Sequence, residues 1–340
     1  MTIASIPWHA SVLEAVAGRL NARQLPHALM ICGEAGVGKA DLAGSIAHLL
    51  VCEHPDLDRA DACGECKQCQ LVSAGSHPDI RRYAPEKKSR VIKVDQVRAL
   101  SAFAVVSPQV AQRKIIIVDR ADVLNISAGN ALLKTLEEPS GDVMLLLLQE
   151  TGRPVLPTLR SRCQQLIVAT PSPEVADHWL ADELNRHHSE AGVSAAQREQ
   201  ALRLARYAPL RALSYLLDDF LGQRGEALNQ FRGFMKGEAS LADATRPFKT
   251  LGLEQTLWLM EVWATDLARM GAGGEGADAE AADMLRYLSS VNPPHRAHRL
   301  LDSLYQSRAA LVNNVSAELE IERLLIEWRS LMPTRRARAG

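Results

Sequence analysis

The sequence contains few aromatic residues, no long apolar run and almost no net charge. Phe, Trp and Tyr together make up 4% of the residues, which disfavours the strand-rich sandwiches and barrels that these residues stabilise. No apolar run reaches the roughly 18–20 residues that a membrane-spanning helix needs. The segment from Met1 to His9 lacks the basic and apolar regions of a signal peptide. We therefore expect a cytoplasmic protein.

An excess of charge of either sign is also missing. The formal net charge is −1, whereas a protein that binds DNA with its whole surface is normally basic. Any contact with nucleic acid is therefore expected to be local or shared with partner proteins, and this charge is equally compatible with no contact at all. The six cysteines would be reduced in the cytoplasm, so a cluster of cysteines indicates a metal site rather than disulfides.

At 340 residues the chain is too long for one ordinary domain, and its pattern changes along its length. In the first part, helical patterns alternate with short apolar runs, which is typical of parallel strands buried on both faces of a sheet. These runs are Ala28–Cys32, Ile115–Val118, Met144–Leu148 and Leu166–Val168. After Pro171, Ser172 and Pro173 the patterns are helical, at 174–187, 195–206, 210–220, 253–270 and 317–331. We expect an α/β domain followed by helices.

A glycine-rich loop follows the first of the expected strands. Gly33-Glu-Ala-Gly36-Val-Gly38-Lys39 stands between that strand and a helical pattern, which is the context of a phosphate-binding loop, or P-loop. The glycines would let backbone N–H groups converge on phosphates at the helix N-terminus, and Lys39 would add a positive charge. In active P-loops the next residue is Ser or Thr, whose hydroxyl binds Mg²⁺, but here it is Ala40.

The expected strand at 115–118 also ends in a changed motif. Asp119 has the position of the acid that assists the metal in ATPases, but Arg120 replaces the Glu that polarises the attacking water. Arginine is permanently charged and cannot act as a base. The run from Asp119 to Asp122 resembles a damaged Asp-Glu-Ala-Asp box. The changes at Ala40 and Arg120 predict a site that no longer hydrolyses ATP, and an active site built from other groups is the alternative.

Four cysteines in a polar stretch form the pattern C-x10-C-x2-C-x2-C. They are Cys52, Cys63, Cys66 and Cys69. Four thiolates satisfy tetrahedral Zn²⁺ and leave no open position, so the expected zinc is structural and not catalytic. Buried packing cysteines and a redox C-x-x-C pair are the alternatives.

Taken together, these motifs resemble the ATPase-type subunits of bacterial sliding-clamp loaders, which belong to the AAA+ family. The segments that carry the resemblance are, in chain order, Leu25–Ala28, Cys63–Cys69, His77–Asp79, Asn130–Pro139 and Ser161–Cys163. A C-terminal helix from Asn314 to Trp328 also resembles the family, less closely. The resemblance covers nearly the whole chain.

The resemblance implies a three-domain architecture. Residues 1–168 would form a RecA-like α/β AAA+ domain, with a zinc module at 52–69. Residues 169–208 would form a small helical lid, and residues 209–333 an all-α collar through which the subunits assemble. A basic tail at 334–340 would follow, solvated and without fixed structure.

The resemblance also assigns roles to two arginines. Arg162, in Ser161-Arg-Cys163, corresponds to the family's arginine finger, which acts in trans on the nucleotide of a neighbouring subunit. From the residues alone, Arg160 and Arg162 would be interpreted as solvated arginines of a surface helix. Arg211 stands where the lid's sensor-2 arginine is expected, and a surface arginine is the alternative there.

Two kinds of subunit compete within this family. Motor subunits of the tau/gamma type keep both nucleotide motifs intact, whereas a second kind carries eroded motifs but keeps Ser-Arg-Cys. Ala40, Arg120 and the chain length favour the second kind, an inactive subunit of the clamp loader. ATP or ADP would bind weakly or not at all, although the retained Lys39 leaves residual binding undecided.

The inactive subunit would assemble with the delta subunit and three motor subunits into a pentamer. That complex loads the sliding clamp onto primed DNA as part of a DNA-directed DNA polymerase, a nucleotidyltransferase holoenzyme. Two other functions remain as alternatives: a working ATPase of the tau/gamma type, and a zinc-dependent nucleic-acid-binding protein outside replication.

Overall fold

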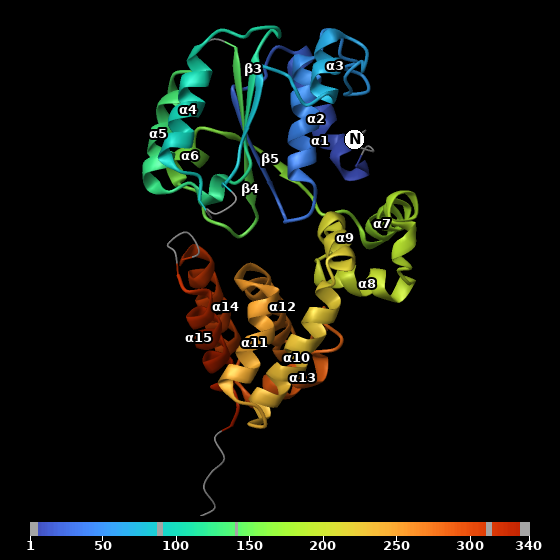
Figure 1. The fold of residues 1–340 in the computed structure, drawn as a ribbon, viewed down its shortest axis with the longest axis vertical. Helices are drawn as coiled ribbons and strands as arrows, with labels where there is room; N and C mark the ends of the chain where they lie inside the picture. Colours follow the sequence, from blue (N-terminus) through green and yellow to red (C-terminus); the bar gives the residue numbers. More distant parts are fainter. Residues whose placement is uncertain (1–5, 87–90, 140–141, 311–314, 334–340) are drawn as a thin grey trace, which may run out of the picture. The chain divides into compact units, whose positions relative to one another are not determined.

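The computed structural model describes residues 6–86, 91–139, 142–310 and 315–333 (Figure 1). The chain divides into two compact units, Met1–Pro171 and Ser172–Gly340, and each is described here by itself. Asn314 and the expected basic tail at 334–340 lie outside the described residues.

Unit 1 is a five-stranded parallel sheet with helices on both faces (Figure 1). The strands are β1 Ala28–Gly33, β2 Ile80–Tyr83, β3 Lys114–Val118, β4 Val143–Glu150 and β5 Gln164–Val168. Their order in the sheet is β2-β3-β4-β1-β5, and every neighbouring pair is parallel. The α-helices of this unit are α1 Ala10–Asn21, α2 Lys39–Val51, α3 Lys67–Ser73, α4 Val94–Val105, α5 Ile126–Glu137 and α6 Pro157–Arg160. Two short 3-10 helices, η1 Pro7–His9 and η2 Ala121–Val123, complete it.

The expected parallel sheet is confirmed, and the apolar runs explain it. Every residue of β3 and β4 is buried, because helices cover both faces of these central strands. The expectation missed β2, which forms one edge of the sheet. Its middle residues Arg81 and Arg82 are exposed, so this strand has no apolar run to reveal it.

The strand order brings three loops together at one edge of the sheet. Parallel strands all end at the same edge, and ligands of open α/β sheets bind there. β4 lies between β1 and β3, so the segments that follow these strands are neighbours. They are the P-loop after β1, residues 119–123 after β3 and residues 151–156 after β4.

All the secondary structure in the described residues of unit 2 is helical, as expected. Its helices are α7 Pro173–His187, η3 Ser189–Ala191, α8 Ala195–Leu204, α9 Pro209–Leu217, α10 Phe220–Lys236, α11 Leu241–Leu251, α12 Leu253–Gly271, α13 Ala282–Val291, α14 His295–Ala310 and α15 Ala317–Arg329. The single helix expected at 210–220 is wrong at its end: α9 stops at Leu217, and Asp219 takes a left-handed φ of 53° before α10 begins. The chain therefore turns where the apolar pattern seemed to continue.

An aromatic cluster forms the core where α10, α11, α12 and α15 meet. Trp263 stacks on Phe231 with ring centroids 5.1 Å apart, and Trp328 meets Phe231 edge-on at 5.5 Å. The Trp263 indole N–H donates to Asp278 at 2.8 Å, and the buried Arg224 pairs with the same carboxylate.

Within the described part of the chain, no helix has the length and apolarity to cross a membrane.

Candidate functional site

The P-loop has the backbone conformation that its glycines predict. Gly36 and Gly38 have φ of 89° and 82°, in the left-handed region that favours glycine. A Cβ atom at Gly38 would lie 2.8 Å from Cε1 of His9, so no larger residue fits without movement. Gly38 directly precedes α2, whose N-terminal N–H groups therefore face the loop.

Side chains from inside and outside the loop stabilise this conformation. Nζ of Lys39 donates to the carbonyls of Gly33 at 2.8 Å and Glu34 at 2.7 Å. The carbonyl of Val37 accepts from Nε1 of Trp8 and lies 2.8 Å from Nε2 of His9. Burial lowers the pKa of His9, so the ring is neutral and donates through Nε2.

The groups that would ligate Mg²⁺ are missing or already paired. Ala40 offers no oxygen at the start of α2. Both carboxylate oxygens of Asp119 lie 2.7 Å from Nε of Arg82, on the edge strand β2. Arg82 was not anticipated from the sequence, since only the pairing of β2 with β3 brings it to Asp119. A guanidinium therefore supplies the positive charge beside this acid.

The second acid of the damaged box lies in a buried ion-pair cluster. Nε of Arg120 donates to Oδ2 of Asp122 at 3.2 Å, and the Asp122 side chain is only 1% exposed. Nη1 of Arg153 lies 3.8 Å from the same oxygen, and Nε of Arg153 lies 2.9 Å from Oε2 of Glu150. We call these residues, Arg120, Asp122, Glu150 and Arg153, the Asp122 cluster. Glu150 and Arg153 were not singled out from the sequence, because nothing in the local pattern shows which loops meet.

Arg162 is held in place although it lies near the surface. It follows α6, and its side chain is 35% exposed. Nη2 lies 2.5 Å from Oε1 of Glu137 at the end of α5, and Nη1 donates to the carbonyl of Thr158 at 2.9 Å. Arg160, two residues earlier, is exposed. The structure thus distinguishes the two arginines, which local sequence alone did not.

Arg211 lies in unit 2, on α9. Its guanidinium carbon lies 3.8 Å from the ring centroid of Trp258 on α12. Arg206 and Arg308 approach the same ring at 4.7 and 5.6 Å. Arg211 is therefore packed in an arginine–tryptophan cluster and is not a freely solvated surface side chain.

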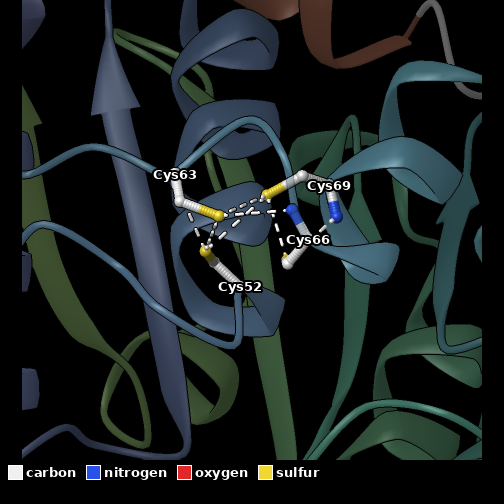
Figure 2. Close-up of side chains that lie close together, drawn as sticks. All are labelled: Cys52, Cys63, Cys66 and Cys69. Atoms are coloured by element: carbon white, nitrogen blue, oxygen red, sulfur yellow. Dashed lines mark hydrogen bonds between the residues drawn. The ribbon is translucent and has the colours of Figure 1, made fainter.

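The four cysteines converge, as Figure 2 shows. Their Sγ atoms all lie within 4.8 Å of one another, and four of the Sγ–Sγ distances are 3.4 to 3.8 Å. Zinc–sulfur bonds of about 2.3 Å in a tetrahedron would separate the sulfurs by about 3.8 Å, so the donor set fits a metal ion of that kind. We call residues 52–69 the cysteine module.

Backbone N–H groups in the cysteine module also favour thiolates. The N–H of Cys63 points to Sγ of Cys52 at 3.3 Å, and that of Cys66 points to Sγ of Cys63 at 3.4 Å. The N–H groups of Cys66 and Glu65 lower the pKa of Cys63, whereas burial raises the pKa of Cys52 and of Cys69. Thiolates are the form that ligates a metal.

Hydrogen bonds fasten the cysteine module to the rest of unit 1. Gln68, on α3, donates to the carbonyl of Val110 at 2.8 Å, and its Oε1 lies 2.9 Å from Nε2 of His77. The buried carboxylate of Asp79 accepts from three backbone N–H groups, at residues 109, 110 and 111. Burial alone would raise the pKa of Asp79, but these donors lower it. The His77-Pro-Asp79 motif thus links the module to the loop before β3.

Known proteins resemble this chain over nearly its whole length. A family model described as DNA polymerase III, delta subunit, matches residues 8–172. DNA polymerase III subunit delta' of Pseudomonas aeruginosa is 33% identical, over 96% of this chain and 97% of its own. The Escherichia coli delta' subunit is 29% identical over 94% of both chains. The E. coli tau subunit is 29% identical over 76% of this chain but only 38% of its own. The chain therefore belongs to the DNA polymerase III delta' family.

Proposed function

We propose that this chain is an inactive subunit of the clamp loader that supplies an arginine finger to a neighbouring motor subunit. The observation that carries the proposal is the contrast within unit 1. The chain's own metal and water-activating positions are altered, whereas Arg162 of the Ser-Arg-Cys motif is held between Glu137 and Thr158. A finger acts in trans, so it remains useful when the nucleotide site of its own subunit decays.

Three features support the loss of hydrolysis. Ala40 has no hydroxyl for Mg²⁺, and Asp119 is ion-paired with Arg82. Arg120 cannot take a proton from water, and its guanidinium is engaged by Asp122. The glycine-rich backbone of the P-loop and Lys39 remain, so weak binding of ATP or ADP is the most that this site supports. In this proposal Arg211 would contribute little to nucleotide binding, because its guanidinium packs on the ring of Trp258.

The partners of the proposal are the delta subunit and the tau/gamma motor subunits in a pentamer. The complex would act on the sliding clamp and primed DNA in the cytoplasm. Residues 169–208 would serve as the lid and residues 209–333 as the collar of this assembly. The cysteine module would hold a structural zinc ion, whose role is to fix the fold of residues 52–69.

Reconstitution tests this function directly. The purified chain, mixed with delta and motor subunits, should form one complex on gel filtration and support ATP-driven loading of the clamp onto primed DNA. The same mixture without the chain should load clamps poorly. Equal loading with and without the chain would refute the proposal.

Without its partners, the chain should show no ATP hydrolysis above background. The reason is the combined loss of the metal ligand and the base at Ala40 and Arg120. Steady-state phosphate release is the measurement, with Lys39→Ala as the matched control. Turnover that disappears in Lys39→Ala belongs to this chain and would support the motor-type alternative. If Ala40→Thr combined with Arg120→Glu gains turnover, the loss of hydrolysis is explained by these two positions.

A further inference from the structure

The Asp122 cluster lies at the start of both segments that hold Arg162. We infer that this cluster positions the arginine finger, and that Arg153 is its central positioning residue. The inference rests on the proposed function, because it concerns how Arg162 is oriented for a neighbouring nucleotide. Arg120, which stands where active ATPases carry the water-activating Glu, is part of this support.

The cluster joins the loops that follow β3 and β4. Asp122 belongs to η2 after β3, whereas Glu150 ends β4 and Arg153 follows it. The side chains of Asp122, Glu150 and Arg153 are 1%, 8% and 8% exposed. The ion pair between Nη1 of Arg153 and Oδ2 of Asp122, at 3.8 Å, joins the two loops, and its burial leaves it little screened by salt.

One path to the finger runs from Asp122 through α5. Asn125 caps this helix just after η2, accepting from the N–H of Ala128 at 2.8 Å. The helix continues to Glu137, whose carboxylate pairs with Arg162. The orientation of η2 therefore sets where the carboxylate partner of the finger lies.

The second path runs from Arg153 through α6. The side chain of Gln149 donates to the carbonyl of Arg153 at 2.9 Å, and Gly152 takes φ of 77°, so the chain leaves β4 in a fixed direction. Leu156 then packs against α5 so closely that a Cβ at Gly129 would lie 2.2 Å from its Cδ1. α6 follows at once, and its Thr158 carbonyl accepts from Arg162.

The contacts of Arg162 with Glu137 and with the Thr158 carbonyl thus trace back to one ion-pair cluster. Loosening the cluster should let α5 and α6 shift slightly against each other and move the guanidinium. A misplacement of about 1 Å can cost roughly 100-fold in rate, even when the change lies far from the chemistry. Binding of ATP to the motor subunit does not depend on this geometry, so kcat should fall while KM stays unchanged.

The test uses the full reconstituted loader with Arg153→Lys or Asp122→Asn in this chain. Arg153→Lys keeps the charge but loses the planar fork, and Asp122→Asn keeps the shape but loses the charge. Thermal unfolding, zinc content and gel filtration establish that each variant is folded and assembled. Arg98→Lys is the matched control, because its pair with Asp95 is exposed and lies on α4. We expect a fall of roughly 10- to 100-fold in kcat at the adjacent motor site for the cluster variants, and none for the control.

Combining each cluster variant with Arg162→Ala shows whether the cluster acts through the finger. If it does, the double variant is no slower than Arg162→Ala alone, since the two residues then act as a unit. If the effects of the two changes multiply, the cluster does not act through the finger and this inference is overturned. The same holds if folded cluster variants have a normal kcat while Arg162→Ala is slow. Either result leaves the proposed finger itself intact. A normal rate for Arg162→Ala itself would instead overturn the proposed finger.

Discussion

Replacing Arg162 with Ala should slow hydrolysis at the adjacent motor subunit by about 1,000-fold or more, the range measured for arginine fingers. The guanidinium is planar and permanently charged, and it presents a fork of donors to phosphate oxygens. It stabilises the charge that develops on the transferred phosphoryl group. Folding and assembly should be unchanged, because the side chain is 35% exposed and its ion pair with Glu137 lies near the surface.

Single-turnover hydrolysis by the reconstituted complex measures this effect. Hydrolysis of the ATP bound at the site that faces this chain should become slow, and clamp loading should be impaired. Arg160→Ala is the matched control, since Arg160 is exposed and ends the short helix α6, two residues before Arg162. Arg162→Lys should restore only part of the rate, because lysine keeps the charge but not the fork. Normal hydrolysis and loading by the Arg162→Ala complex would show that the finger assignment is wrong.

Replacing Cys66 with Ser should abolish metal binding and unfold the cysteine module. One Zn²⁺ per chain is expected in the native protein, and structural zinc contributes roughly 10–16 kcal/mol of apparent binding free energy at neutral pH. The loss should spread from residues 52–69 to the loop at 109–111, because Gln68 and Asp79 connect them. β1 and the P-loop should keep their structure.

Elemental analysis and hydrogen exchange measure the two parts of this prediction. Zinc content should fall from one ion per chain to none, and exchange should rise in the module and at 109–111. Cys32→Ala is the control, since Cys32 lies on β1 outside the four-cysteine set and its loss should leave zinc bound. A reduced, fully folded native preparation without zinc would contradict the prediction.

The sequence predicted the features that depend on neighbouring residues in the chain. Continuous apolar runs predicted four of the five strands. β1, β3 and β4 are central strands covered on both faces, whereas β5 lies at the second edge of the sheet and buries only Leu166 and Val168. The edge strand β2 was not predicted, because Arg81 and Arg82 leave it without a continuous apolar run. In unit 2, the helices α10, α11, α13 and α14 were not predicted; α11 even contains Pro247 within the helix, which local propensity disfavours.

In the candidate site, too, local features were predicted from the sequence and tertiary contacts were not. The cysteine spacing and the glycine loop are local patterns, and the structure brings the four sulfurs together. Asp119, Asp122 and Arg162 each have a partner that is distant in the chain: Arg82, Arg153 and Glu137 reach them only through strand order and helix packing. Such pairings are decided by tertiary structure, so a single sequence does not reveal them.

The hydrogen bond between Trp8 and the P-loop gives this protein an internal optical probe. Trp8 is the only tryptophan among the first 171 residues, and its indole N–H donates to the carbonyl of Val37 within the loop. Indole emission changes in colour and intensity with hydrogen bonding and local polarity. The other four tryptophans, at 179, 258, 263 and 328, give a background that a Trp8→Phe variant defines. The difference spectrum therefore reports, without any label, whether adding ATP or ADP moves the loop.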